Sequence, residues 1–357
     1  MKIKIAFYSH NIDFAGTWRA HERIAEKIQL DERFETYVLY TNAVDNNRLE
    51  VAKKVLYNCS FLHFERSKEK LGPQTGYTPV DTNFDDVIRT HGIEILHFAR
   101  SGYYEWPFNK RICRSQIETN IFGYRDPSHH LDGTISIARC LGLHDYKNTV
   151  LLPNPMPLPS HQFEDVQDLR EELGINKTTL VFGRIGRPAN FSPIALAAFN
   201  EFRKHVPSKY IIVGACSEAQ AFIRNYNMQD DVIMIECTND DHFIERFHKT
   251  IDVFAHYRSD GEICSTAITQ ALMYGIPVIT HSAGLNGQVE WLGPGGACVN
   301  NHDMYLQAML QISDPNIRKA VGLRAKEYAM KTFEQEAVVK EIADFYISIY
   351  RKCQQVK

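Results

Sequence analysis

Short apolar runs alternate with longer segments of helical periodicity along most of this sequence, and that alternation constrains the fold more than any other feature. A strand followed by a helix and a further strand predicts parallel sheets with helices on both faces. The expected strands are 3–8, 35–40, 61–64, 93–98, 116–122 and 133–137 in the first half, and 179–182, 210–213, 232–235, 252–256 and 277–280 in the second. The expected helices are 17–30, 193–205, 217–226, 240–249 and 264–274, with a helical tail from residue 315.

The chain has 357 residues, more than one domain usually contains, so two domains are expected. Prolines occupy alternate positions from Pro153 to Pro159. Because proline fixes φ and lacks an N–H donor, this linker is expected to be extended and to lie outside both cores. The predicted domains are residues 1–157, joined by the C-terminal helix 334–357, and residues 158–333. The predicted fold is α/β, with two Rossmann-like, doubly wound parallel-sheet domains facing each other across a cleft.

Charge and cysteine usage exclude several functional classes. The formal net charge is −3, so no overall field favours nucleic acid or an anionic membrane. The eight cysteines include no Cys-x-x-Cys pair, which favours a reducing, cytoplasmic environment over a disulfide framework. No segment approaches the ~20 apolar residues of a membrane span, and no signal peptide is recognisable. The pair His129-His130 has no further ligands at metal spacing and there is no Asp-x-Asp, so neither a metal nor another cofactor is predicted.

The most informative polar segments follow expected strands of the second half, where ligands bind in parallel sheets. Arg184 and Arg187 flank a glycine after the first of these strands, and two guanidinium groups there could hold one diphosphate. The alternative is a solvated surface turn.

Glu262 and Gln270 lie eight residues apart, so on one helix they would be separated by ~12 Å with similar facing. A donor sugar would then bind at Glu262, its phosphates at the N–H groups of Ser265 and Thr266, and a ribose at Gln270. The alternative is a capping glutamate and an exposed glutamine.

Two segments of the first half are weaker candidates. Gly16 precedes an expected helix and permits close backbone approach of a phosphate, although a single glycine there is more often a turn. His97 and Arg100 come at the end of an expected strand, followed by Tyr103 and Tyr104. These groups suit a sugar acceptor or the far edge of a donor, with a structural histidine as the equal alternative.

Taken together, these segments resemble the retaining glycosyltransferases of the GT-B fold, and specifically glycosyltransferase family 4. The resemblance is carried by residues 180–346, with the Gly-Arg-Ile start of the second domain, "TIDVFAHYRSDGEICSTAITQALMYGIPVIT" at 250–280 and the glycine-bearing loop 284–287. It implies that Arg184 and Arg187 hold the donor diphosphate, Glu262 the sugar and Gln270 the ribose, while Gly16 lines the phosphates from the other domain. Two positions depart from the family: its E-x7-E pattern is E-x7-Q here, and its usual lysine is Ala189. Arg187 supplies a replacement charge.

The resemblance implies transfer of a sugar with retention of configuration, by front-face attack of an acceptor hydroxyl, with the leaving diphosphate taking the proton. Domain closure would bring Gly16 and His97 onto the donor. The expected donor is a UDP-sugar, with GDP as the second choice, carrying a hexose or a pentose such as xylose. A glycan acceptor is favoured over a lipid. The rival hypothesis is a nucleotide-sugar-binding protein without turnover. An epimerase is disfavoured because no acid/base carboxylate pair is found, and an NAD oxidoreductase because the first loop lacks GxGxxG.

Overall fold

The computed structural model describes the whole chain except residues 1, 10–11, 13–15, 42–43, 66–68, 73–75, 80–81, 161–162, 189 and 356–357. For residues 69–72, 76–79 and 164 it describes the backbone alone. The chain divides into two compact units. The first unit contains Met1–Pro157 and Glu334–Lys357, and the second contains Leu158–Phe333.

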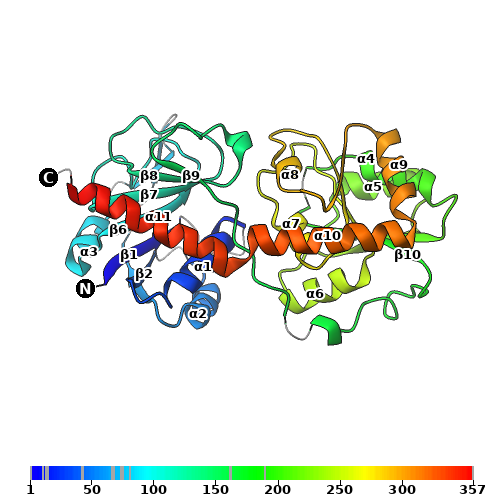
Figure 1. Cartoon of the computed structure of the whole chain (residues 1–357), viewed down its shortest axis with the longest axis horizontal. Helices are drawn as coiled ribbons and strands as arrows, with labels where there is room; N and C mark the ends of the chain where they lie inside the picture. Colours follow the sequence, from blue (N-terminus) through cyan, green and yellow to red (C-terminus); the bar gives the residue numbers. More distant parts are fainter. Residues whose placement is uncertain are drawn as a thin grey trace. The chain divides into compact units, whose positions relative to one another are not determined.

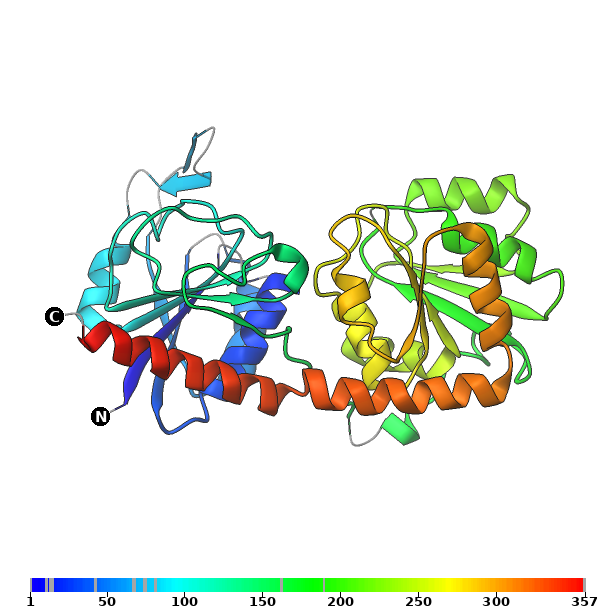
Figure 2. The same cartoon turned by 45° about the horizontal axis from the view of Figure 1, so that its top comes forward.

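The first unit is built on a parallel sheet of seven strands in the order β3-β2-β1-β6-β7-β8-β9. Strand order reverses between β1 and β6, which makes the sheet doubly wound. The strands are β1 (Ile3–Tyr8), β2 (Phe34–Tyr40), β3 (Ser60–His63), β6 (Ile95–Arg100), β7 (Ser115–Asn120), β8 (Gly133–Ser136) and β9 (Thr149–Leu151). A separate antiparallel hairpin, β4 (Glu69–Gly72) and β5 (Gly76–Pro79), is set off from this sheet in Figure 2.

The helices of the first unit include one contributed from the far end of the chain. They are α1 (Gly16–Ile28), α2 (Asn46–Val55), α3 (Phe84–His91), α11 (Gln335–Gln355) and the short 3-10 helix η1 (Arg139–Leu141). Helix α11, red in Figure 1, runs beside α1 across one face of the sheet. Its side chains Val338, Ile342 and Tyr346 are buried in the same core as the strand residues Ile5, Val38 and Ile95. The C-terminal helix therefore completes the first core.

The second unit has a parallel sheet of six strands in the order β12-β11-β10-β13-β14-β15, with its reversal between β10 and β13. Its strands are β10 (Leu180–Ile185), β11 (Ser208–Val213), β12 (Val232–Ile235), β13 (Val253–Ala255), β14 (Val278–His281) and β15 (Gly296–Val299). Its helices are η2 (Phe163–Asp165), α4 (Ile194–Phe202), α5 (Ser217–Asn225), α6 (Asp241–Thr250), α7 (Thr266–Met273), α8 (Gly287–Glu290), α9 (His302–Ile312) and α10 (Pro315–Phe333). Helix α10 packs against α7 and α9.

The prediction of two Rossmann-like, doubly wound parallel-sheet domains is confirmed. The linker expectation is wrong in part, because Met156 is 1% exposed and its sulfur accepts a hydrogen bond from Arg23. The proline-rich stretch up to Met156 therefore packs on the first unit, and the chain becomes exposed only at Pro157 and Leu158. Among the described residues, no helix has the length and apolar character needed to cross a bilayer.

Candidate functional site

The strand reversal of the second sheet gathers polar side chains from two neighbouring strands. Arg184 is the fifth residue of β10, and His256 directly follows β13, the strand that pairs with β10. The carboxyl ends of β10 and β13 flank the switch point, where parallel α/β sheets bind ligands. The charges of Arg184 and Arg258 both act on the imidazole of His256, so the three groups share one environment. The candidate site of the second unit is therefore centred on this reversal.

Arg184 is a buried cation whose donors are incompletely satisfied. The residue is 5% exposed, and its guanidinium lies 4.4 Å from the ring centroid of Tyr257. Its Nη2 donates to the backbone oxygen of Arg187 at 3.4 Å, which is long for a hydrogen bond. Its Nε is buried and has no hydrogen-bond partner among the residues that the structure describes. A buried charge without an acceptor is costly, so this geometry favours an anion bound beside Arg184.

Arg187, the second predicted arginine, is placed differently. It lies in the exposed turn after β10, and only its backbone oxygen contacts Arg184. Its guanidinium has no ion-pair partner among the residues that the structure describes. Gly186, between the two arginines, would bring a Cβ atom to 3.4 Å from Nη2 of Arg184. The small residue keeps the turn close to the buried guanidinium.

Glu262 is anchored by two basic side chains. Its Oε1 lies 3.6 Å from Nε2 of His256 and 3.3 Å from Nη1 of Arg258, and its side chain is 21% exposed. Burial alone would raise the pKa of Glu262, but the hydrogen bond and charge of His256, together with Arg258, hold it below its ordinary value. Burial lowers the pKa of His256, and Glu262 only partly offsets that effect. Glu262 is therefore a carboxylate acceptor at neutral pH.

Two glycine-bearing loops hold Glu262 in place. Gly261 and Gly284 have φ values of 74° and 57°, and a Cβ on Gly284 would lie 1.6 Å from the backbone oxygen of Asp260. Gln288, 1% exposed, accepts from the backbone N–H of Glu262 at 2.9 Å and donates to the backbone oxygen of His281. This close packing of the loop after β13 on the loop after β14 fixes the backbone of Glu262.

Helix α7 begins later than the sequence indicated. It starts at Thr266, and Ser265 is its N-cap, accepting from the N–H of Ile268. The expected helical spacing of Glu262 and Gln270 is wrong, because Glu262 lies four residues before the first helical residue in an irregular loop. Gln270 is in the helix and half-buried. The first-turn N–H groups at Thr266 lack partners within the helix, as at every helix start.

Of the first-unit candidates, Gly16 lies where a loop meets a helix. It is the first residue of α1 and is exposed, and a Cβ there would meet nothing within 4 Å. Residues 10–11 and 13–15 of the preceding loop lie outside the described residues. The role expected for Gly16 stays a prediction.

His97 was expected to reach the donor, and the structure contradicts this. The residue lies within β6 and is 0% exposed. Its Nδ1 is 3.1 Å from Nε2 of His21 and 2.7 Å from the hydroxyl of Tyr346, and its Nε2 is 2.9 Å from the hydroxyl of Thr119. Burial, followed by the charge of His21, puts the pKa of His97 well below its ordinary value. His97 is a core residue that joins α1 and α11 to the sheet.

Arg100 is also a core residue, and its expected contact with an acceptor is wrong. It is the last residue of β6, and its side chain is fully buried. Its Nε donates to Glu118 at 2.6 Å and its Nη2 donates to Asp126 at 2.9 Å. Arg100 was misplaced because β6 runs to Arg100 rather than ending at Phe98, whereas His97 lay inside the expected strand and its side chain faces the core. Tyr103 and Tyr104, by contrast, are 41% and 40% exposed.

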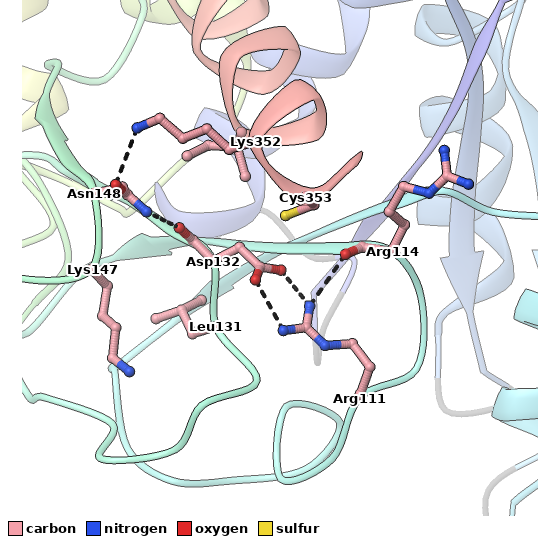
Figure 3. Close-up of a pocket in the computed structure, with 9 residues that line it drawn as sticks. Arg111, Arg114, Leu131, Asp132, Lys147, Asn148, Lys352 and Cys353 are labelled. Carbon is pink, nitrogen blue, oxygen red and sulfur yellow. Dashed lines mark hydrogen bonds and ion pairs between the residues drawn. The ribbon is translucent and has the colours of Figure 1, made fainter. Parts of the chain in front are cut away.

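A cavity of about 410 Å³ in the first unit is a second candidate site (Figure 3). Its lining includes Arg111, Arg114, Lys147 and Lys352, but these cations do not converge. Arg111 is paired with the central Asp132 at 2.9 Å, Lys352 bonds Asn148, and Arg114 points away from Asp132. The cavity also opens where β7, β8 and β9 begin, the edge opposite to the one where such sheets bind ligands. It therefore ranks below the site at Arg184.

The sequence interpretation missed His256, Arg258, His281 and Gln288. Nε2 of His281 accepts from the backbone N–H of Arg258 at 3.2 Å, and Arg258 also pairs with Asp260 at 2.6 Å. A signal was present, because the basic residues His256 and Arg258 lie at and just after the end of the expected strand 252–256, shortly before Glu262. No comparable signal marked Gln288, which lies 26 residues after Glu262 and contacts its backbone N–H from a different loop. In the described part of the chain, no three His, Cys, Asp or Glu side chains group as metal ligands, and metal independence stays a prediction.

Comparisons with known proteins place this site in a family context. Residues 163–328 match the model of the family "Glycosyl transferases group 1", and this range contains Arg184, Glu262 and α7. No curated protein matches the sequence significantly.

Solved structures resemble the chain over nearly its whole length. A glycosyltransferase from Rickettsia africae has 13% identity and a TM-score of 0.73, covering 98% of both chains. HepE of Anabaena, in a complex with UDP, has 16% identity and a TM-score of 0.71, covering 98% of this chain and 100% of its own. Sucrose-phosphate synthase from Thermosynechococcus elongatus has 14% identity and a TM-score of 0.70, with the same coverage. At these identities the likeness establishes the fold shared with glycosyltransferases.

Proposed function

We propose that this chain is a glycosyltransferase that takes a sugar from a nucleoside diphosphate donor, a UDP-sugar, and transfers it to a hydroxyl of a glycan. The observation that carries the proposal is the unpartnered Nε of the buried Arg184 at the strand reversal of the second unit. A diphosphate beside Arg184 satisfies that donor, and the uncommitted guanidinium of Arg187 can bind the same anion. The match of residues 163–328 to glycosyl transferases and the UDP complex of HepE support this assignment.

The remaining groups have complementary roles in the proposed complex. Glu262, held as a carboxylate by His256 and Arg258, accepts hydrogen bonds from hydroxyls of the donor sugar. The N-terminus of α7, at Ser265 and Thr266, faces the phosphates. Gln270 binds the ribose diol, where its amide can both donate and accept. A hexose and a pentose such as xylose both offer Glu262 suitable hydroxyls.

In the proposed reaction, the bond between the anomeric carbon and the leaving diphosphate breaks while the acceptor oxygen bonds to that carbon on the same face. The acceptor proton passes to the leaving diphosphate, so the products are the glycoside and the nucleoside diphosphate. Negative charge grows on the leaving group, and Arg184, Arg187 and the start of α7 stabilise it. The configuration at the anomeric carbon is retained. A metal ion is not needed for this charge, so turnover should persist in EDTA.

Arg184→Ala tests the assignment, with Arg224→Ala as its matched control. Arg224 is exposed on α5, so its substitution removes the same charge away from the site. Arg184→Ala should lower release of UDP from UDP-glucose at least ~100-fold, the effect of losing one stabiliser of developing charge. Arg224→Ala should release UDP at the wild-type rate. Normal turnover by Arg184→Ala would refute the proposed site.

The replacement of the family's second glutamate by Gln270 favours a second candidate function, nucleotide-sugar binding without turnover. Thermal unfolding with UDP- and GDP-sugars separates the two, since binding to the native state raises the transition temperature. A binder without turnover would show that rise and release no UDP. For an active enzyme, NMR of the product gives its anomeric configuration, and an inverted product would contradict front-face attack.

A further inference from the structure

Four aromatic side chains are exposed on the two loops that follow β6 and β7. Tyr103 and Tyr104 are 41% and 40% exposed after β6, and Phe122 and Tyr124 are 52% and 45% exposed after β7. Large aromatic groups exposed together on one surface typically mark a binding site. The carboxyl ends of β6 and β7 lie at the edge of the parallel sheet where ligands bind, and β6 borders the reversal between β1 and β6.

Tyr103 and Tyr124 form a face-to-face pair, here called the tyrosine stack. Their ring centroids are 3.9 Å apart, with an angle of 22° between the ring planes. The side chain of Tyr124 raises the pKa of the Tyr103 hydroxyl through hydrogen bonding, in keeping with the close approach of the two rings. Each ring uses one face for the other ring, and Tyr103 and Tyr124 stay 41% and 45% exposed, so the pair presents aromatic carbon and hydroxyl groups to solvent.

Buried polar residues fix the backbone of both tyrosines. The guanidinium of Arg100, held by Glu118 and Asp126, donates through Nη1 to the backbone oxygen of Tyr103. Asn120, 0% exposed, donates through Nδ2 to the backbone oxygen of Tyr124 at 2.8 Å. These contacts give the buried Arg100 a positioning role.

Gly102 lets the two loops approach each other. Its φ is 96°, and a Cβ there would lie 2.2 Å from both the backbone oxygen of Tyr124 and the Nδ2 of Asn120. Any other residue would separate the loops. The tyrosine stack is therefore held rigidly before any ligand arrives, which reduces the entropy lost on binding.

We propose that the tyrosine stack binds a pyranose ring of gluco configuration in the glycan acceptor, a role that rests on the proposed function. In a gluco-configured ring the hydroxyls are equatorial, so both faces present axial C–H bonds that fit a flat aromatic surface. The tyrosine hydroxyls at the border can bond the equatorial hydroxyls of the sugar. An aliphatic lipid chain would leave those hydroxyls without partners, which favours the saccharide.

Saturation-transfer NMR on the full chain, with cellotriose and maltotriose at millimolar concentration, tests the proposal. Tyr103→Ala and Tyr124→Ala should weaken oligosaccharide binding about tenfold, the usual scale for truncating an aromatic anchor. Tyr124→Phe keeps the ring and removes one hydroxyl, so it should weaken binding less than Tyr124→Ala does. Tyr57→Ala is the matched control, because Tyr57 is 67% exposed at the end of α2, before β3 begins. Circular dichroism establishes that each variant is folded.

Saccharide contact that disappears in both alanine variants and persists in Tyr57→Ala would support the proposal. No transfer to either oligosaccharide in the wild type, or unchanged transfer in the alanine variants, would overturn it. Self-association of the wild type that is lost in Tyr124→Ala would also overturn it, because a second copy would then cover the stack. UDP binding is measured in the same samples. Saccharide contact without UDP binding would count against the proposed function and leave the saccharide site standing.

Discussion

Gly174 and Gly284 have similar backbone angles but differ in the space around the position of a Cβ atom. Alanine substitutions at these two positions therefore separate backbone strain from steric overlap. Gly284 and Gly174 have φ values of 57° and 64°, but only Gly284 has backbone against the position of a Cβ, at 1.6 Å from Asp260 O. Gly174→Ala should cost about 1–2 kcal/mol of stability and leave donor binding unchanged, because only the left-handed conformation is strained. Gly284→Ala should in addition displace the loop that holds Glu262.

We expect Gly284→Ala to weaken UDP-sugar binding at least about tenfold, which corresponds to about 1.4 kcal/mol. Isothermal titration of both variants measures the difference directly. Equal affinities in the two variants would show that Glu262 does not depend on this loop contact.

At the same scale, residue chemistry predicted the placement of Arg184 and Glu262 in the second unit better than that of His97 and Arg100 in the first. Arg184 and Glu262 were predicted from charged side chains after apolar strands, and both lie near His256 at the strand reversal. His97 and Arg100 had equally suitable chemistry, but His97 faces the core from within its strand, and the strand of Arg100 ends two residues later than expected. A shift of two residues at a strand end decides between a buried side chain and a loop, and one sequence does not resolve it. Partners distant in sequence, such as Gln288, depend on the fold itself.

Helix α11 is the element whose packing most affects the first unit. Ile342 is 1% exposed in the core shared with α1 and the sheet, whereas Ile317 on α10 is 37% exposed. Ile342→Ala should destabilise the first unit by about 2–5 kcal/mol, because it leaves a cavity between helix and sheet. Ile317→Ala should cost less than about 1 kcal/mol in the second unit. Hydrogen exchange of peptides from each unit, measured in urea, shows which unit each substitution destabilises. A first unit that keeps its wild-type stability in Ile342→Ala would contradict the packing described for α11.

Elements with strong patterns were predicted within a few residues of their ends. Strand β1 is Ile3–Tyr8 and β12 is Val232–Ile235, as expected, because β12 is a continuous apolar run and Lys4 alone interrupts the apolar run of β1. Helix α2 was missed because its sequence NNRLEVAKKV buries little on any face. Strand β15 was missed because GACV lacks the bulk of a typical strand and is specified by pairing with β14. Tertiary contacts outweigh local preference in such segments.

On the scale of the whole molecule, the chain consists of two units with separate cores, each containing buried histidines. His21 and His97 lie in the first unit and His248 and His256 in the second, all 3% exposed or less. Burial lowers the pKa of His21 to about 3 and that of His248 to about 4. Within the described part of the chain, Nε2 of His248 has no hydrogen-bond partner, so a proton there would gain no hydrogen bond to those residues.

These depressed pKa values make both units sensitive to acid. Between pH 6.5 and about 4 the unfolded chain binds a proton at His21 and at His248 while the folded units do not, so the stability present above pH 6.5 falls as pH decreases. Each histidine contributes a slope of up to about 1.4 kcal/mol in the free energy of unfolding per pH unit.

His248→Phe removes one such group. It preserves an aromatic ring beside Tyr274, on which the imidazole of His248 stacks with the ring centroids 4.8 Å apart. The substitution should reduce the number of protons that the second unit takes up on unfolding in acid by about one, so its free energy of unfolding should fall less steeply as pH decreases. Urea unfolding at a series of pH values measures this slope. His205→Gln, at an exposed position of the same unit, is the control substitution. If His248→Phe retained the full wild-type slope, the acid sensitivity of the second unit would have to come from groups other than His248.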